Sequence, residues 1–449
     1  MSNIKTDLQT INAIHFIGIG GIGMSALARF FLHEKKSVSG SDRAASAITD
    51  ALVREGVKFF PTQVASNIST RRDLELGVTP DLVVYTEAMA ADQEEMVAAM
   101  ALGVPMVNYF DALGMVANEY YLIAVAGAHG KTTTTAMLTD VLEEAGLDPT
   151  AIVGSLRSKT GSNFRAGKSK YAIVEACEYK RDFLSLKPDV LVITNIEWEH
   201  VDYYKDLADV QDAFHTLAMA VPADGAIIVA ANMPNLLPVL AGVSATVIDY
   251  QKSLDLGLKL RQPGLHNRQN AAAARAVAEF LGVETEVATT ALENFAGTWR
   301  RFEYKGDIVP VASLGGGLVP VYDDYAHHPT EIKMAILGAR ELHPDKKLTA
   351  VFQSHTYTRT HELFADFVTE LVKADRVVML PIYAAREEDV SGVTSQQLVA
   401  EINKAGTKAI FFETIAAAAL FVRETVVGGD MVMTMGAGPV TEVATELTK

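Results

Sequence analysis

A short loop in the first third of the chain has the residue types that bind the phosphates of a nucleoside triphosphate. The loop follows an apolar run at residues 120–126, and its members are Gly127, Ala128, His129, Gly130, Lys131, Thr132 and Thr133. Its lysine can offset phosphate charge, its first threonine can ligate magnesium, and the amides of a following helix can face the phosphates. The loop is two residues shorter than the common phosphate loop, whose first glycine would replace Val125. A purely structural glycine turn would not need lysine and threonine in this order, so we interpret the loop as a triphosphate site.

Two later segments place metal-binding side chains at the ends of apolar runs. Glu175 ends a run that begins at Tyr171, and His200 closes the segment 195–200, which follows another run at residues 189–194. If these runs are strands parallel to the strand before the loop, both side chains lie at the same edge of the sheet. A carboxylate there is often only solvated, and a single loop histidine often has no role. Beside a phosphate loop we favour the functional interpretation, with Thr132, Glu175 and His200 as metal ligands.

A glycine-rich turn near the N-terminus has the spacing of a dinucleotide-binding motif. It reads Gly18-Ile19-Gly20-Gly21-Ile22-Gly23, between an apolar run at residues 12–18 and a helical pattern at residues 24–32. Glycines at this spacing let the backbone approach a diphosphate, and Asp42 after the next strand can accept from a ribose hydroxyl. The pattern indicates a diphosphate rather than NAD. The same glycines can also serve only the close packing of helix against strand, and the sequence leaves that alternative open.

Three clusters in the second half of the chain also combine polar and titratable side chains. Residues 266–270 open an alanine-rich helix, where amide side chains can pair with an adenine edge; the alternative is that Asn267 caps the helix. Residues 323–329 end a strand, and a capping turn before a proline accounts for part of their composition. Residues 353–359 follow another strand, which places their histidine and arginine at the carboxyl edge of a sheet, where α/β proteins bind ligands.

Apolar runs alternate with helical patterns along most of the chain, which indicates parallel sheets covered by helices. Strands are predicted at residues 12–18, 37–38, 81–85, 104–107, 120–126, 171–176, 189–194, 226–230, 318–323, 347–352, 376–380, 408–411 and 431–434. Helices are predicted at residues 24–32, 47–55, 92–101 and 269–281, and the segment 286–295 follows the last of them. The groups predict an α/β chain of three domains: a Rossmann-like domain at 1–118, a P-loop ATPase-like domain at 119–300 and a second Rossmann-like domain at 301–449.

Composition excludes several classes of function. The 449 residues, 49% of them hydrophobic and 21% charged, are typical of a globular protein with several cores. A formal net charge of -16 argues against nucleic acid and anionic membranes as partners and favours small phosphorylated molecules. We find no apolar run of membrane-spanning length and no secretory signal pattern, and the single cysteine, Cys177, agrees with a reducing compartment. We therefore expect a cytoplasmic protein.

These motifs, taken in order, resemble those of the bacterial Mur ligase family. The resemblance covers nearly the whole chain and rests on eight segments, at residues 14–25, 127–135, 195–200, 265–270, 300–302, 323–331, 352–359 and 435–438. One such match would carry little weight, but eight in sequence are hard to obtain by chance. Four places depart from the family pattern. Thr356 replaces a frequent arginine, and Glu199 replaces a frequent aspartate. Residues 175–179 differ from a frequent acidic run, and residues 85–89 differ from the usual serine pair.

The resemblance implies an ATP-dependent ligase that uses magnesium and acts in peptidoglycan precursor synthesis. Such an enzyme joins L-alanine to the carboxylate of UDP-N-acetylmuramate through an acyl phosphate and releases ADP and phosphate. Its expected partners are UDP-N-acetylmuramate, L-alanine and ATP, with no nucleic acid and no membrane. An alternative within the family is a ligase that attaches a recycled tripeptide to the same UDP-sugar.

Two alternatives from other classes explain less of the sequence. An NAD-dependent oxidoreductase explains the glycine-rich turn, but not the lysine–threonine loop or the third domain. A nucleotide-binding regulatory protein would not need an acid and a histidine that can reach a metal near the phosphates.

The resemblance also assigns roles to residues of the second and third domains. Lys131 and Thr132 would hold the phosphates and magnesium, and Glu175 and His200 would serve a second magnesium site. ATP would in addition be bound by His266, Asn270, Arg301 and Asp324.

The remaining roles concern the amino acid and the UDP-sugar. The amino acid and the muramyl carboxylate would be surrounded by Tyr325, His327, His355 and Arg359. Either of the two histidines can act as the base, and the sequence does not decide between them. The UDP-sugar would contact Gly18, Gly20, Gly21, Gly23, Met24, Ser25, Ser41 and Asp42.

Overall fold

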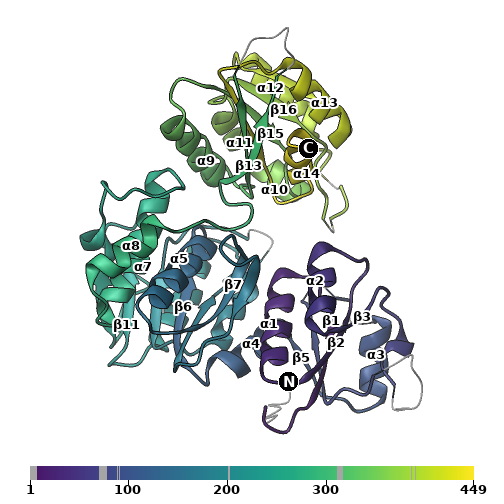
Figure 1. Ribbon diagram of the computed structural model, residues 1–449, viewed down its shortest axis with the longest axis vertical. Helices are drawn as coiled ribbons and strands as arrows, with labels where there is room; N and C mark the ends of the chain where they lie inside the picture. Colours follow the sequence, from purple (N-terminus) through teal and green to yellow (C-terminus); the bar gives the residue numbers. More distant parts are fainter. Residues whose placement is uncertain are drawn as a thin grey trace. The chain divides into compact units, whose positions relative to one another are not determined.

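Three sheets organise the protein (Figure 1). The computed structural model describes residues 8–69, 78–87, 89–90, 92–200, 203–310, 317–385, 387–389 and 391–449. The chain forms two compact units: the first comprises residues 1–254 and 270–292, and the second residues 255–269 and 293–449. Among the described helices, none combines the length and the apolar character that crossing a bilayer requires.

The first sheet lies in the first unit and has five parallel strands in the order β3-β2-β1-β4-β5. Its strands are β1 (Ala13–Ile17), β2 (Ser37–Ser41), β3 (Lys58–Phe60), β4 (Leu82–Tyr85) and β5 (Met106–Asn108). Its helices are α1 (Ile22–His33), α2 (Ala47–Glu55), η1 (Ala65–Asn67), α3 (Glu94–Ala101) and α4 (Tyr109–Ala117). The strand order and the glycine turn after the central strand are those of a Rossmann-like domain, as predicted.

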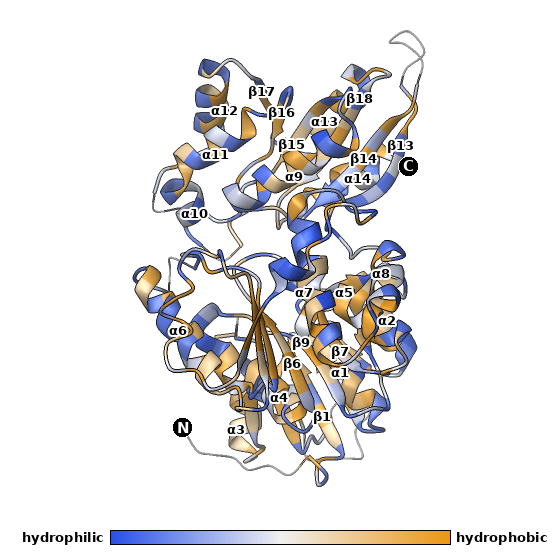
Figure 2. Ribbon diagram, turned by 90° about the vertical axis from the view of Figure 1, so that its left-hand side faces the viewer, coloured by the Kyte–Doolittle hydropathy of each residue, from blue (hydrophilic) through white to orange (hydrophobic). Residues whose placement is uncertain are grey.

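The second sheet also lies in the first unit and has the order β12-β11-β10-β6-β9-β7-β8. Its strands are β6 (Tyr121–Ala126), β7 (Thr150–Arg157), β8 (Ser162–Arg165), β9 (Tyr171–Glu175), β10 (Val190–Ile193), β11 (Ala226–Val229) and β12 (Thr246–Asp249). Its helices are α5 (Lys131–Glu144), η2 (Tyr179–Ser185), α6 (Leu207–Met219), η3 (Tyr250–Ser253), α7 (Leu265–Phe280) and α8 (Thr285–Glu293), the last two of which cross a unit boundary. Apart from the tyrosine that begins each strand and Glu175, which ends β9, the residues of strands β6 and β9 are hydrophobic (Figure 2), as expected for parallel strands covered on both faces.

The third sheet forms the second unit and has the order β13-β14-β18-β15-β16-β17. Its strands are β13 (Glu303–Ile308), β14 (Val319–Asp324), β15 (Lys347–Phe352), β16 (Arg376–Met379), β17 (Lys408–Phe411) and β18 (Asp430–Met435). Its helices are α9 (Pro329–Leu342), α10 (Tyr357–Glu362), α11 (Phe364–Leu371), α12 (Ser395–Lys404), α13 (Ile415–Thr425) and α14 (Thr441–Leu447). Only β13 pairs antiparallel in this part of the described chain.

Most predicted elements are confirmed, and four of the five strands that were not predicted share one feature. The strands that were not predicted are β3, β7, β8, β12 and β13. Strand β3 is short, β8 and β13 pair antiparallel, and β12 is an edge strand with two exposed residues, so none of these four is a long apolar run. Helix α7 begins at Leu265, four residues before its predicted start. The predicted domain boundaries near residues 118 and 300 stay predictions.

The first two sheets share one hydrophobic core, which explains why they form one unit. Buried side chains from both sheets belong to the same cluster. Helix α1 packs on the β7–β8 hairpin, where the rings of Phe30 and Phe164 are 6.2 Å apart. The amide of Asn163, which is fully buried, donates to the carbonyl of Ile22 at 2.5 Å and to the hydroxyl of Ser25 at 2.9 Å. The glycine-rich turn is therefore fixed to the phosphate-loop domain by packing and by buried hydrogen bonds.

Candidate functional site

The phosphate loop connects the central strand β6 to helix α5, which begins at Lys131. Gly127 and Gly130 have φ values of 132° and 83°, a region that favours glycine. A side-chain carbon on Gly127 would lie 2.1 Å from the hydroxyl of Thr194, and one on Gly130 would lie 2.5 Å from the side-chain oxygen of Asn270. Both glycines are thus required by conformation and by space, and the turn directs the free amides of the first turn of α5 outward from the sheet edge.

The segment after β10 holds the loop in place. Strand β10 pairs with β6, so Thr194 and Asn195 lie beside the loop. The side chain of Asn195 accepts from the amide of His129 at 2.9 Å and donates to the carbonyl of His129 at 3.0 Å, and the hydroxyl of Thr194 donates to that carbonyl at 2.5 Å. These bonds give the motif at residues 195–200 a structural role that the sequence did not show.

The ammonium of Lys131 is held in a buried ion pair with Glu178. Its Nζ lies 3.0 Å from a carboxylate oxygen of Glu178, and it donates to the carbonyls of Gly127 and Ala128. Burial opposes the charge of Lys131, but the surrounding carboxylates, Glu178 foremost, raise the pKa of Lys131. Burial likewise opposes the charge of Glu178, yet Lys131 and His200 lower the pKa of Glu178 to about 2. The loop therefore carries a permanent positive charge at neutral pH.

Glu178 is a site residue that the sequence analysis did not single out. It lies three residues after Glu175, outside the strand, in a segment whose Lys180 and Arg181 have left-handed backbone conformations. Its carboxylate is 3% exposed. A sequence signal did exist, because Glu175 and Glu178 are three residues apart at the end of a strand and can both reach the same sheet edge. The sequence does not tell which of the two carboxylates faces the lysine.

Thr132 and Glu175 lie together, as a shared metal ion requires. The hydroxyl of Thr132 donates to Glu175 at 3.0 Å, and the other carboxylate oxygen accepts from the amide of Gly154 at 2.9 Å. Strand β9 pairs with β6 so that Glu175 is opposite Val125, and this register brings its side chain to the loop. Both groups are hard oxygen donors, which suit magnesium.

His200 belongs to a second group of potential ligands. Ligand atoms of Glu178, Glu199 and His200 lie within 4.8 Å of one another, and His200 Nε2 is 3.6 Å from Glu178. His200 has a φ of 53°, a conformation that is uncommon for a residue with a side chain and that is found at functional sites. The structure therefore separates the three predicted metal ligands into the pair Thr132–Glu175 and a neighbourhood around His200.

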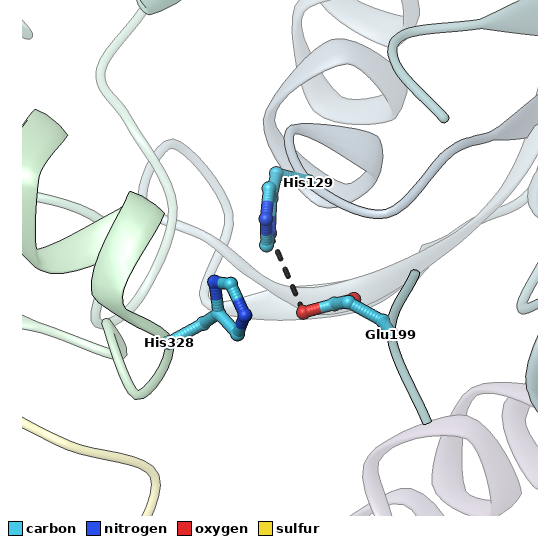
Figure 3. A group of neighbouring side chains, drawn as sticks. All are labelled: His129, Glu199 and His328. Carbon is cyan, nitrogen blue, oxygen red and sulfur yellow. Dashed lines mark ion pairs between the residues drawn. The ribbon is translucent and has the colours of Figure 1, made fainter. Parts of the chain in front are cut away.

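His129 of the phosphate loop also faces acidic side chains. Its ring lies 3.5 Å from Glu197 and 3.7 Å from Glu199, the second of which is drawn in Figure 3 with the ion pair dashed. His328 in the same figure belongs to the second unit. The acidic side chains around the loop therefore include Glu197 and Glu199 as well as Glu175 and Glu178.

The predicted UDP-sugar residues form the turn after β1, but two of their hydroxyls point into the protein. The carboxylate of Asp42 accepts from the amide of Gly20 at 2.8 Å, so it closes the turn. Ser41 is fully buried and donates to Glu95 at 2.6 Å, and Ser25 is fully buried and donates to the carbonyl of Ile22. Met24 is a core residue. The contacts predicted for these residues stay predictions, and in this structure the two hydroxyls are used within the protein.

The predicted adenine residues lie one turn apart on helix α7. The side chain of Asn270 packs against Gly130 of the phosphate loop. His266 is near the start of the helix, where burial lowers its pKa to about 4, so the ring is neutral at pH 7. Asn267 lies inside the helix rather than before it, and its amide donates to the carbonyl of Pro263 at 2.8 Å.

In the second unit, the end of β14 brings the predicted ATP residues together. Asp324 accepts from the amides of Phe302 and Ala326 at 2.8 Å each, and burial raises the pKa of Asp324 to about 6 although Arg301 opposes this shift. The guanidinium of Arg301 lies 5.3 Å from the ring centre of Tyr325. The predicted ATP residue Arg301 therefore lies beside the predicted amino-acid residue Tyr325.

Arg300, next to Arg301, is a second residue that the sequence analysis gave no role. It is buried, forms an ion pair with Asp323 at 2.8 Å and donates to carbonyls of the glycine segment at residues 436–438. This contact fixes the glycine segment at the end of β18 to the end of β14. Arg300 is thus a structural link between two of the segments that carried the resemblance.

The two candidate bases of the second unit differ in their free ring nitrogens. His355 Nδ1 is 3.1 Å from Arg359 Nη1, and because arginine only donates, this nitrogen must accept. Burial is the main cause that lowers the pKa of His355 to about 3, and the nearby His327 and Arg359 act in the same direction. His327 Nδ1 is 3.0 Å from the carbonyl of Tyr325 and 3.1 Å from Glu331, so its proton lies on Nδ1 and its Nε2 keeps a lone pair. The two rings are 5.8 Å apart.

Comparison with family models covers all three sheets. The description "Mur ligase family, catalytic domain" matches residues 13–121, "Mur ligase middle domain" matches residues 125–253, and "Mur ligase, glutamate ligase domain" matches residues 300–438. The chain belongs to the Mur ligase family. As a Mur ligase it is an ATP-dependent enzyme that forms an amide bond, which confirms the predicted family, fold class and class of enzyme.

Individual Mur ligases resemble the chain over almost its whole length. It is 39% identical to the UDP-N-acetylmuramate--L-alanine ligase of Agathobacter rectalis, over 99% of both chains. It is 37% identical to the enzyme of the same name from Caldanaerobacter subterraneus subsp. tengcongensis, over 98% of both chains. Among solved structures, the UDP-N-acetylmuramate-alanine ligase of Thermotoga maritima superposes with a TM-score of 0.79 at 26% identity, covering 97% of this chain and 98% of that one.

The ion pair of Lys131 gives a prediction that separates chemistry from stability. Lys131→Met should abolish ligation, and it should also lower the free energy of unfolding by about 3 kcal/mol, because Glu178 loses its main partner while it stays buried. The double variant Lys131→Met, Glu178→Gln should recover most of that stability and none of the activity. Urea unfolding and phosphate release from ATP measure the two effects.

Lys159→Met is the matched control, since Lys159 is 47% exposed and pairs with Glu143 at 3.4 Å on the surface. It should leave both quantities near their original values. Substantial ligation by Lys131→Met would contradict the role of the lysine in the reaction. Equal stability of the single and double variants would contradict the claim that the unpaired, buried Glu178 destabilises the single variant.

Proposed function

We propose that this Mur ligase joins L-alanine to the carboxylate of UDP-N-acetylmuramate at the expense of ATP, in the synthesis of peptidoglycan precursors. The observation that carries the proposal is the match, over nearly the whole chain, to relatives that bear this activity in their names. The phosphate loop supports it, because Lys131 pairs with Glu178 and Thr132 bonds to Glu175 at the same edge of the sheet. We further propose that the reaction takes place in the cytoplasm and that it supports cell shape and division.

The chemistry needs activation because a carboxylate is a poor acyl donor. Its oxygen attacks the γ-phosphorus of ATP, the bond to the bridging oxygen of ADP breaks, and an acyl phosphate forms. The amine of L-alanine then attacks the acyl carbon, and the carbon–oxygen bond to phosphate breaks when the tetrahedral intermediate collapses. The products are the amide, ADP and phosphate, so the free energy of ATP is conserved in the amide bond.

The first unit supplies the residues for phosphoryl transfer. Lys131 keeps its charge and can offset the negative charge that develops on the transferred phosphoryl group, and the amides at the start of α5 can bind the remaining oxygens. Magnesium would be held by Thr132 and Glu175 near the phosphates and by His200 beside Glu178. Bound there, it would supply further positive charge to the phosphate oxygens.

The second unit supplies the residues for amide formation. Arg359 and Tyr325 would bind the amino acid, with Arg359 as the cation for its carboxylate. An amino group is protonated at neutral pH, so a base must take a proton before or during the attack. We propose His327 as this base because its Nε2 keeps a lone pair, whereas His355 uses the lone pair of its Nδ1 toward Arg359.

A test of the substrate follows from the two family alternatives. Phosphate release from ATP is measured with UDP-N-acetylmuramate and one amine at a time: L-alanine, L-serine, glycine or the recycled tripeptide. We expect the highest kcat/KM with L-alanine and no release above background with the tripeptide. Release with the tripeptide alone would contradict the proposal and favour the recycling ligase.

A test of the base compares two matched histidine variants. His327→Gln should lower kcat by roughly a hundredfold with little change in the KM for ATP, since general base catalysis contributes about 10²–10⁴-fold. His355→Gln should mainly raise the KM for L-alanine, because it disturbs Arg359. At high pH the rate of His327→Gln should recover in part, since the amine then loses its proton without help. If His355→Gln instead shows the larger loss of kcat and the recovery at high pH, the assignment is reversed.

A further inference from the structure

Tyr109 lies where the two sheets of the first unit meet, and the site described above gives it no role. It is the first residue of α4, which packs on η2, the segment that follows Glu178. Ser185 of η2 donates from its hydroxyl to the carbonyl of Phe110 at 3.0 Å. The start of α4 is thereby fixed to the phosphate-loop domain, although the helix follows the last strand of the first sheet.

The ring of Tyr109 covers the end of the glycine-rich turn. A side-chain carbon built on Gly23 would lie 2.6 Å from Cζ of Tyr109 and 2.7 Å from its hydroxyl. Only glycine therefore allows the ring to approach the first turn of α1 this closely. The resemblance places a UDP-sugar at this turn, so the hydroxyl lies beside the expected ligand.

The same hydroxyl lies near the carboxylate that the proposal gives to the metal. Burial first, and then the negative charge of Glu175, raise the pKa of Tyr109, so the phenol keeps its proton at neutral pH. Among the residues that the structure describes, none forms a hydrogen bond with this hydroxyl. Within the described residues it is a donor without a partner, and it lies against Gly23 of the turn.

We propose that the Tyr109 hydroxyl donates a hydrogen bond to the muramyl carboxylate of the UDP-sugar and so selects the acidic sugar nucleotide. This inference rests on the proposed function. The diphosphate is expected at the glycine turn, while the carboxylate must reach the phosphate loop to receive the phosphoryl group. Tyr109 lies against Gly23 of the turn, on a helix that packs on η2, the segment after Glu178. A phenol suits the task because its pKa is far above that of a carboxylic acid, so it binds the carboxylate without protonating it. The acid stays ionised and nucleophilic.

The test uses Tyr109→Phe in the full-length protein and two sugar nucleotides. UDP-N-acetylmuramate has the carboxylate, and UDP-N-acetylglucosamine has the same nucleotide and lacks it. The variant keeps the ring against Gly23 and removes only the hydroxyl. We expect the dissociation constant and the KM for UDP-N-acetylmuramate to rise about tenfold, as for a lost hydrogen bond to a charged group. The KM for ATP and the dissociation constant for UDP-N-acetylglucosamine should not change.

The ratio of the two dissociation constants decides the outcome, because a smaller folded fraction would weaken both ligands alike. An unchanged ratio of the two dissociation constants overturns the proposal. If neither constant changes, the hydroxyl does not contact the ligand; if both rise equally, it contacts the nucleotide that the two ligands share. Tyr121→Phe is the matched control: it removes a hydroxyl from the first residue of β6, at the opposite end of the strand from the phosphate loop, and should leave the ratio as in the wild type. Failure of the wild type to use UDP-N-acetylmuramate would instead overturn the proposed function, and the inference with it.

Discussion

The buried charge of Lys131 is the constraint on which the arrangement of the first unit depends. A lysine that is shielded from water loses its proton unless opposite charge compensates for the lost hydration. Here Glu178 provides that charge, and the carbonyl of Glu178 is itself fixed by a hydrogen bond from the hydroxyl of Tyr204 at 2.5 Å. The pair keeps the cation ready at the start of α5. A triphosphate can then take over the role of the carboxylate as the partner of Lys131.

The register of the central sheet explains why these groups meet. Strands β9 and β10 flank β6, so residues that follow each strand reach the same edge as the phosphate loop. One neighbour brings Glu175 and Glu178, and the other brings Asn195 and His200. The sheet therefore places a cation, acidic groups and an amide that holds the loop within one small region, although they are far apart in sequence. This is the general position of ligands in parallel α/β sheets.

The first two sheets belong to one compact unit, and the expected sites for the acid and for the phosphates of ATP both lie in it. Asn163 and the aromatic contact of Phe30 with Phe164 fasten α1 to the β7–β8 hairpin, and α4 rests on η2. The turn expected to bind the UDP-sugar and the loop expected to bind ATP thus share one hydrophobic core. The residues proposed for the amine belong to the other unit. The turn and loop expected to bind the acid and the phosphates of ATP therefore lie in one unit, whereas the residues proposed for the amine, and the predicted ATP residues His266, Arg301 and Asp324, lie in the other.

Much of the fold follows from the sequence because buried parallel strands are continuous apolar runs. Strands β15 and β17 have the predicted bounds, whereas β12 and the antiparallel β13 contain several polar residues, are not continuous apolar runs and were not recognised. The lysine–threonine loop was recognisable for the same reason that it works: its chemistry needs those residues in that order. Glu178, in contrast, owes its role to burial beside Lys131, and no local pattern reports a contact across the sheet.

The sequence also did not predict the roles of residues that depend on where their side chains point. Ser41 lies in the segment predicted to bind the UDP-sugar, yet its hydroxyl points to the buried Glu95. Tyr109 belongs to no motif, and only its position over Gly23 brings it to notice. A sequence pattern gives the strand end at which a side chain lies, but the side of the strand and the packing decide what that side chain meets.

The central claim is that Lys131 and its neighbours turn an unreactive carboxylate into an acyl phosphate. It is tested most directly by labelling the carboxyl oxygens of UDP-N-acetylmuramate with ¹⁸O and following turnover with ATP and L-alanine by mass spectrometry of the phosphate released. Each phosphate should carry one labelled oxygen from the sugar, since the carbon–oxygen bond breaks when the amine displaces phosphate. Phosphate without label, released in step with the amide product, would contradict it.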